Sequence, residues 1–353
     1  MTTKLARIVR RTASVAIIAL TGFSLAAGAA VADDTPAKQA FGAMKLPSKA
    51  APNPIGFYAK GCMAGAVALP TDGPTWQAMR LSRNRRWGNP AMISFLEKFS
   101  QDATQLGWGS GILVGDISQP RGGPMLTGHA SHQIGLDADI WFTPKPTQAL
   151  SVQQREDMPF TSMLDKTKFL TVNPKRWTST HARLVMQAAS YPQVERVFVN
   201  PAIKKKLCET WTGDRDLLGK VRPVYGHDEH FHIRLFCPAG AANCKAQAPV
   251  AKGDGCDQSL AWWFTDEPWA KPKPNPNAKP VKPRVVTVSD LPKACAAVLT
   301  APASSEQAAT FGSAYVAPTP QADDAAIQSV INNQGDALPR SDVPVPAARP
   351  AGQ

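Results

Sequence analysis

The chain has 353 residues, a formal net charge of +12 and six cysteines. Because no Cys-x-x-Cys pair occurs, a cysteine-based zinc module is not expected. In an oxidising compartment the even cysteine count instead favours three disulfides, for which fifteen pairings exist. Beyond the N-terminal segment no apolar run is long enough to span a membrane, so we expect no transmembrane segment in the mature chain.

The N-terminal segment has the pattern of a secretory signal peptide, which we expect over residues 1–32. Four basic residues precede an apolar run over residues 13–29, and Ala30-Val31-Ala32 is a small-residue cleavage signature. An uncleaved N-terminal anchor is the alternative. Removal of the four basic residues takes the formal charge from +12 to +8. Since an exported protein meets no nucleic acid, its positive field favours an acidic polymer, such as a cell wall with free carboxylates.

The rest of the chain predicts one α+β domain over residues 56–299, between a loose lead-in (33–55) and a disordered tail (300–353). Residues 145–178 have weak periodicity and are expected to form an insertion or flexible loop at the rim of the site. The Pro-rich residues 267–290 are expected to form an extended linker. The expected elements are a helix over 90–106, a buried strand over 111–116, a helix over 180–189 capped by Thr180, a strand over 194–200 and a helix over 201–208.

Three clusters allow a functional and a purely structural interpretation. The basic residues Arg83, Arg85 and Arg86 bind substrate carboxylates or form a solvated face, which is the commoner case. Lysines 204–206 are most simply the wet face of a helix. The aromatic residues 262–264 form a sugar platform or pack in the core, and core packing is favoured.

The stretch over residues 225–236 predicts a β-strand entered through a short loop. From His230 onward, side chains alternate between the two faces of the strand, so His230, His232 and Arg234 share one face. Two imidazoles then lie roughly 7 Å apart on a rigid base. The opposite face is apolar and anchors the strand in a core: Phe231, Ile233 and Leu235.

A second stretch, over residues 128–141, ends with the same alternation and places Asp137, Asp139 and Trp141 on one face. Five of the six histidines of the chain lie in these two stretches. The sixth, His181, lies at the start of a predicted helix, where a solvated or capping role is favoured over a ligand. This concentration of imidazoles predicts a shared site.

The two stretches predict three metal ligands: His132, Asp139 and His232. Two imidazoles and one carboxylate form a common zinc set, and three protein ligands leave a fourth position open for water, as in catalytic sites. Zinc lowers the pKa of such a water to about 7. His230 is placed to act as a general base or to stabilise an oxyanion, while His227 and His129 can orient water or the metal shell.

Other hydrolase chemistries have no signature in the sequence. No His-Glu-x-x-His helix supports a thermolysin-like protease, and neither Ser-x-x-Lys nor Gly-x-Ser-x-Gly supports an acylated serine.

The spacing from His132 to Asp139, followed by His230-Phe-His232, resembles the pattern of the lysostaphin, D-Ala-D-Ala carboxypeptidase and Hedgehog-like metallopeptidase clan. The resemblance is closest to the penicillin-insensitive murein endopeptidases and covers roughly residues 56–299. Its motifs are Gly61-Cys62, Leu81-Ser-Arg-Asn-Arg85, Gly128-His-Ala-Ser-His-Gln-x-Gly-Leu-Asp-x-Asp-Ile140, Phe198-Val-Asn-Pro-Ala-Ile-Lys204 and Gly253-Asp-Gly-Cys256.

This resemblance implies a periplasmic zinc hydrolase that cuts peptide cross-links between D-alanine and meso-diaminopimelate in murein. By similarity, the zinc ligands are His132, Asp139 and His232, with His129 as a further metal-site residue. By the same similarity, His230 and His227 assist catalysis. The fold expected from these features is a small antiparallel sheet that carries the site, flanked by helices and long loops.

The resemblance also implies the disulfide pairing: Cys62–Cys295, Cys208–Cys256 and Cys237–Cys244. Some members of the family offer an extra Asp/His metal pair in the mid-chain loop. Here Asp165 is followed by Lys168 where the histidine would be sought, so one zinc ion is expected.

Two other functions stay open at this point. A zinc D,D- or L,D-carboxypeptidase would trim the ends of murein peptides, and a non-catalytic metal-bearing module would only bind the wall. The presence of His230 and His227 argues against the second, whereas only substrate data separate an endopeptidase from a carboxypeptidase. In each case the expected partner is peptidoglycan.

Overall fold

The computed structural model describes residues 34–270 and 283–310. The expected signal peptide, the middle of the expected linker and the tail beyond residue 310 lie outside these residues. None of the helices in the described ranges has the length and apolar content needed to cross a membrane.

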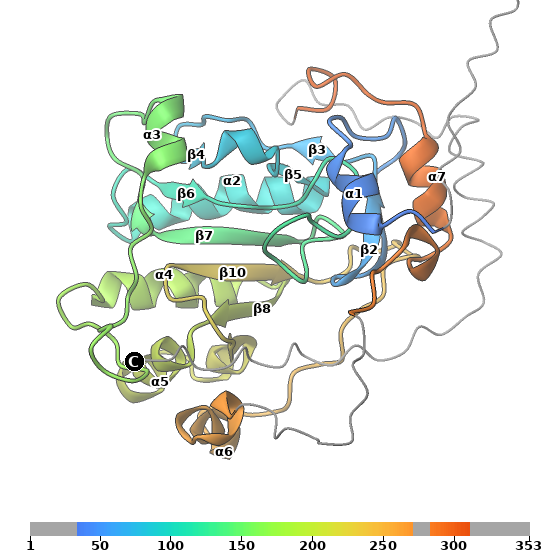
Figure 1. The fold of residues 1–353 in the computed structure, drawn as a ribbon. Helices are drawn as coiled ribbons and strands as arrows, with labels where there is room; N and C mark the ends of the chain where they lie inside the picture. Colours follow the sequence, from blue (N-terminus) through green and yellow to red (C-terminus); the bar gives the residue numbers. More distant parts are fainter. Residues whose placement is uncertain (1–33, 271–282, 311–353) are drawn as a thin grey trace, which may run out of the picture. The chain divides into compact units, whose positions relative to one another are not determined.

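The strands of the two histidine-containing stretches, β7 and β10, are neighbours in the middle of a six-stranded sheet (Figure 1). The inner pairs β6–β7, β7–β10 and β10–β8 are antiparallel, whereas the outer pairs β4–β6 and β8–β9 are parallel. The expected antiparallel sheet is therefore the centre of a mixed sheet. In spatial order the strands are β4 (Trp76–Ala78), β6 (Ile112–Val114), β7 (Asp137–Pro144), β10 (His230–Leu235), β8 (Val194–Val199) and β9 (Val221–Pro223).

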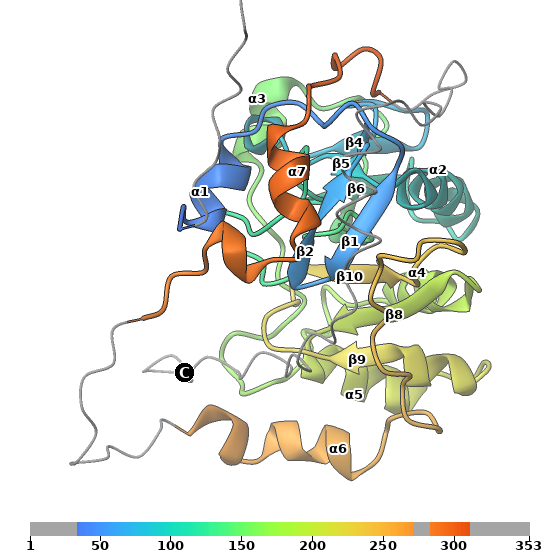
Figure 2. The same cartoon turned by 90° about the vertical axis from the view of Figure 1, so that its right-hand side faces the viewer.

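Two long helices cover the apolar face of this sheet. Figure 2 shows α2 (Pro90–Gln105) and α4 (Ser179–Ser190) on the same side of the strands, and apolar residues of both helices form one core with the inner strands. Because α2 and α4 occupy that face, the polar residues of β7 and β10 point to the opposite one. Both helices lie where the sequence predicts them, but the expected cap of α4 is wrong. Its cap is Thr178, which exchanges hydrogen bonds with His181.

The expected loose lead-in is folded. Its helix α1 (Ala37–Gly42) and strand β1 (Asn53–Phe57) belong to a second core, in which Phe41 is fully buried. The C-terminal helix α7 (Ala294–Thr300) contributes to the same core. The segment is therefore held by a partner that lies far away in the sequence, which its small, polar composition does not indicate.

The ends of the two other segments expected to lack structure are also packed. In the expected linker, Trp269 is buried against Trp263, which confirms core packing for part of the aromatic run. In the expected tail, Ala309 is buried and Thr310 pairs with Ala68. The remaining short elements are β2 (Lys60–Ala64), β3 (Val67–Ala68), β5 (Trp87–Gly88), α3 (Val152–Asp157), α5 (Pro201–Thr210) and α6 (Gln258–Ala261).

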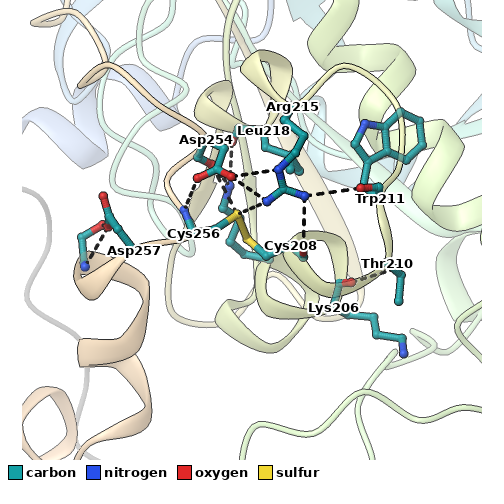
Figure 3. The surroundings of a disulfide bond; sticks show 11 residues. Lys206, Cys208, Thr210, Trp211, Arg215, Leu218, Asp254, Cys256 and Asp257 are labelled. Carbon is teal, nitrogen blue, oxygen red and sulfur yellow. Dashed lines mark hydrogen bonds and ion pairs between the residues drawn. A yellow bond between two sulfur atoms is a disulfide. The ribbon is translucent and has the colours of Figure 1, made fainter.

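Three disulfides are present in the described residues, two of which join distant parts of the chain. Cys62–Cys295 ties β2 to α7, Cys208–Cys256 ties α5 to the loop before α6, and Cys237–Cys244 closes the loop after β10. These are the pairs that the family resemblance implies. Figure 3 shows the second bridge beside the ion pair of Arg215 and Asp254, whose Nη2 and Oδ2 atoms are 2.6 Å apart.

The lysine run of α5 differs from expectation. Lys205 is exposed, but Lys204 is fully buried, and its Nζ donates to the carbonyl oxygens of Leu218 (2.7 Å) and Asp254 (2.6 Å). The loop that Cys208–Cys256 holds against the helix covers this side chain, so the wet-face prediction is wrong for Lys204.

Candidate metal centre

The register of β7 and β10 assembles half of the site. His232 lies directly opposite Asp139, Arg234 opposite Asp137, and His230 opposite Trp141. Directly opposed residues of antiparallel strands point to the same face, so the two polar faces predicted from the sequence are one surface. The core fixes this register, since a slip by one residue would send every one of these polar side chains into the apolar layer.

His132 is presented by the loop that precedes β7, with its backbone in the left-handed region at φ 66°. Its ring is fully buried, and its Nδ1–H donates to the carbonyl oxygen of Ile117 at 2.7 Å. The other nitrogen, Nε2, lies 3.4 Å from Asp139 Oδ1 and carries the lone pair when the ring is neutral. Neither of these two buried atoms has a hydrogen-bond partner.

His232 approaches the same carboxylate from β10. Its Nε2–H donates to Asp137 Oδ1 at 2.8 Å, while its Nδ1 faces Asp139 Oδ1 at 3.9 Å. This arrangement fixes the ring and leaves Nδ1 with a lone pair, as expected for a metal-binding histidine oriented by a carboxylate.

His129 completes a compact group. Its Nε2 lies 3.0 Å from Asp116 Oδ2 and 3.5 Å from Asp139 Oδ2. Among the described residues, the one set of His, Cys, Asp or Glu whose ligand atoms all lie within 4.8 Å of one another is His129, His132 and Asp139. The predicted ligand His232 is not in this set, but its Nδ1 lies 3.9 Å from Asp139 Oδ1 and its ring centre lies 4.5 Å from that of His132.

The two predicted catalytic histidines lie at the edge of this group. The Nε2 of His230 is 3.7 Å from Asp139 Oδ1, and the side chain is about a quarter exposed, at 23%. His227 has a left-handed backbone (φ 54°), donates its Nδ1–H to the carbonyl oxygen of Tyr225 and lies with its ring centre 5.1 Å from that of His230. Both rings are thus close to the metal-site residues without being part of the compact group.

Two carboxylates that support the site were missed by sequence reasoning. Asp137 is fully buried and accepts hydrogen bonds from the ring of His232, the backbone N–H of His132 and the guanidinium of Arg234. The alternation did place it on the site face, but only the strand register shows which imidazole it holds. Asp116 holds His129, and no periodic signal marks it because it follows the short strand β6.

Electrostatics keep the carboxylates ionised. Burial alone raises the pKa of Asp137 and Asp139, but Arg234 and the surrounding imidazoles outweigh it and hold both well below the usual range. Burial lowers the pKa of His132, yet the charge of Asp139 overcomes it and raises that pKa to about 9. For His232, burial dominates and lowers the pKa to about 4. A cation bound at the group would take the place of the proton that Asp139 otherwise holds on His132.

The donor set fits a divalent metal ion. The His132 Nε2 and Asp139 Oδ1 atoms are buried and have no hydrogen-bond partner among the described residues, which normally costs free energy unless a ligand satisfies them. Imidazole nitrogen with carboxylate oxygen is a donor set that suits zinc. No second group exists in the described ranges, where Asp165 and Lys168 form an exposed ion pair.

A pocket opens beside these residues. Four residues of the candidate metal centre and its surroundings line it: Asp116, His129, Asp139 and His230. Arginine and aromatic side chains complete the lining: Arg80, Arg83, Trp141 and Phe160. Phe160 belongs to the segment 145–178, so the segment predicted to lie at the rim of the site does contribute to this pocket.

A buried His/Asp group beside a pocket, on a disulfide-bonded α+β fold, is compatible with a hydrolase. Comparison with known proteins gives the family. The sequence model of the penicillin-insensitive murein endopeptidase family matches residues 54–300. The chain therefore belongs to this family of peptidases, as its motifs predicted.

Named relatives agree with this assignment. A penicillin-insensitive murein endopeptidase of Haemophilus influenzae is 45% identical over 250 residues, which cover 71% of this chain and 83% of the relative. Proteins of the same name from Klebsiella pneumoniae and Salmonella newport are each 40% identical. They cover 69% and 72% of this chain, and 85% and 88% of their own lengths.

Proposed function

We propose that this protein is a zinc-dependent murein endopeptidase that hydrolyses D-alanyl–meso-diaminopimelyl cross-links of peptidoglycan in the periplasm, after removal of residues 1–32. The observation that carries the proposal is the pair of buried, unpaired atoms His132 Nε2 and Asp139 Oδ1, 3.4 Å apart at the wall of an open pocket. Membership of the family and the names of the relatives support the substrate.

One zinc ion would be held by His132, Asp139 and His232, with His129 beside them. When bound, zinc supplies Lewis acidity that polarises a scissile carbonyl and makes water nucleophilic near neutral pH. Ile117 accepts a hydrogen bond from Nδ1 of His132, and Asp137 accepts one from Nε2 of His232. This leaves the other nitrogen of each ring for the metal.

In this proposal His230 transfers the proton and His227 assists it. His230 is partly exposed at the pocket, so its imidazole can take a proton from the attacking water and later return it to the leaving amine. His227 donates one ring N–H to the Tyr225 carbonyl, which leaves its second nitrogen able to accept a hydrogen bond beside His230.

Digestion of purified cross-linked sacculi tests the proposal. The wild-type protein should release uncross-linked muropeptides, identified by mass, and a chelator should abolish the release until zinc is restored. The His132→Ala variant should lose both stoichiometric zinc and hydrolysis, because two remaining protein ligands leave an incomplete shell. Full activity of metal-free protein would refute zinc dependence. Release of terminal D-alanine alone, without loss of cross-links, would instead show a carboxypeptidase.

A further inference from the structure

The pocket beside the candidate metal centre is lined by a partly exposed guanidinium group, that of Arg83. Asp116 Oδ2 accepts hydrogen bonds from two guanidinium groups, Arg85 at 2.9 Å and Arg83 at 3.2 Å. The side chains of Asp116 and Arg85 are buried, with 2% and 9% of their surface exposed, whereas that of Arg83 is 40% exposed. Arg83 thus shares its carboxylate partner with the buried Arg85, and its own guanidinium is the more exposed of the two at the pocket.

The backbone around Arg83 is held in a strained form. The single 3₁₀ turn Leu81–Arg83 lies between Arg80 and Asn84, both in the left-handed region at φ 52°. Such conformations are costly for residues other than glycine, and they persist where the surrounding structure requires them. Here Asn84 is fixed by hydrogen bonds to Lys45 and Trp87, and Arg80 and Arg83, at the two ends of the turn, both line the pocket.

The pocket is also lined by a second arginine and by two aromatic side chains, Trp141 and Phe160. The guanidinium of Arg80 lies 5.2 Å from the ring centres of both Trp141 and Phe160, and it donates to the carbonyl oxygens of Arg155 and Met158. These contacts fix Arg80 as part of the wall. Gly115 forms the floor, where a Cβ atom would come within 3.0 Å of Trp141 Nε1.

We propose that Arg83 is a specificity-determining residue that binds the free carboxylate on the carbon attached to the scissile nitrogen. The inference rests on the proposed function, because in a D-alanyl–meso-diaminopimelyl cross-link that carbon bears such a carboxylate. Arg83 and the metal-site residues Asp139 and His230 line the same pocket, so one ligand can reach both. A guanidinium suits this role because it pairs with a carboxylate through two parallel hydrogen bonds.

A pair of synthetic cross-linked peptides tests the assignment, one with the free carboxylate at that carbon and one with a carboxamide. For the wild-type protein, kcat/KM should favour the carboxylate by roughly 10- to 100-fold, the range expected for a hydrogen-bonded charge pair. In Arg83→Gln the preference should fall to near unity, mainly through a higher KM for the carboxylate peptide. Arg83→Lys should recover part of the preference, since it restores the charge without the fork geometry.

Matched controls separate this role from a structural one. Arg183→Gln removes an exposed guanidinium of α4 that contacts only Ser179, Thr180 and the Leu106 carbonyl, and it should leave the preference unchanged. Zinc content should be the same in Arg83→Gln and wild type. If Arg83→Gln slows both peptides equally, or keeps the wild-type preference, Arg83 does not read the carboxylate and the inference is overturned. If the wild-type protein cleaves neither peptide, the proposed function itself fails, and the inference with it.

Discussion

The position of His230 makes it a residue whose loss should separate metal binding from hydrolysis. Its Nε2 lies 3.7 Å from Asp139 Oδ1, but the proposed site already takes its three protein ligands from His132, Asp139 and His232. We therefore expect His230→Ala to keep near-stoichiometric zinc while the rate of cross-link hydrolysis falls by about 10² to 10⁴-fold, the usual contribution of a positioned acid–base group. Elemental analysis and muropeptide release from sacculi measure the two properties.

The contrast with His132→Ala provides the control for His230. If His230→Ala loses zinc to the same extent, His230 is a ligand and the assignment of the two strand histidines is reversed. Retention of both zinc and full rate would assign the proton transfer to His227 or His129.

How far the sequence predicts the site is clearest residue by residue. The alternation of polar and apolar residues placed His230 and His232 on one face of their strand and Asp139 on one face of the other. It succeeded because neither alternating pattern is interrupted. It could not assign Asp137 to His232, since that pairing depends on a register between segments 95 residues apart. Asp116 carries no local signal, because what makes it functional is its contact with His129, across a loop.

Among the elements, α5 differs most from its local sequence. Its lysine run predicts a solvated face, yet Lys204 is covered by the loop that carries Asp254 and Cys256. Burial lowers the pKa of Lys204 to about 7. Four further charged groups act on it, two of each sign: Arg222, Asp254, Arg215 and Asp257.

This burial predicts a pH-dependent stability. Because the folded pKa is about 7 and the ordinary value is 10.5, the unfolded chain binds more protons than the folded chain between these two values. The free energy of unfolding should therefore rise with pH from 7 to 9 through this group. Lys204→Met lacks this contribution. The melting temperature of the wild type should therefore rise relative to that of the variant as the pH increases from 7 to 9.

Lys205→Met is the matched control, since Lys205 is an exposed neighbour on the same helix that pairs with Glu209. It should leave the pH dependence of the wild type intact. Parallel melting curves of wild type and Lys204→Met from pH 7 to 9 would contradict the prediction.

At the scale of the whole molecule, Cys62–Cys295 joins parts of the chain that are 233 residues apart. It holds α7 against β2, and with them the core that orders residues 37–57. This long-range link explains why the composition of residues 33–55 predicted a loose lead-in. Apolar residues such as Phe41 are few there, and their packing partners lie near the other end of the domain. The spacing of apolar residues predicts a helix such as α2 well. It does not show which distant segment packs against a given element.

The bridge should be a major source of stability. In the chain-entropy account, a cross-link that closes a loop of this length contributes about 5 kcal/mol, against about 2 kcal/mol for one that closes a loop as short as that of Cys237–Cys244. Replacing both Cys62 and Cys295 by Ala should therefore lower the urea midpoint more than replacing Cys237 and Cys244. Equal losses for the two double variants would show that loop closure does not set the contribution.

The placement of the site on two adjacent strands has a consequence for how such a peptidase can diverge. β7 and β10 carry Asp139, His230 and His232, while Arg83 and Phe160 reach the pocket from segments outside both strands. Insertions or substitutions in those outer segments can therefore reshape what the pocket accepts without moving the proposed metal centre. Substrate preference and bond cleavage are then two traits that selection can change one at a time.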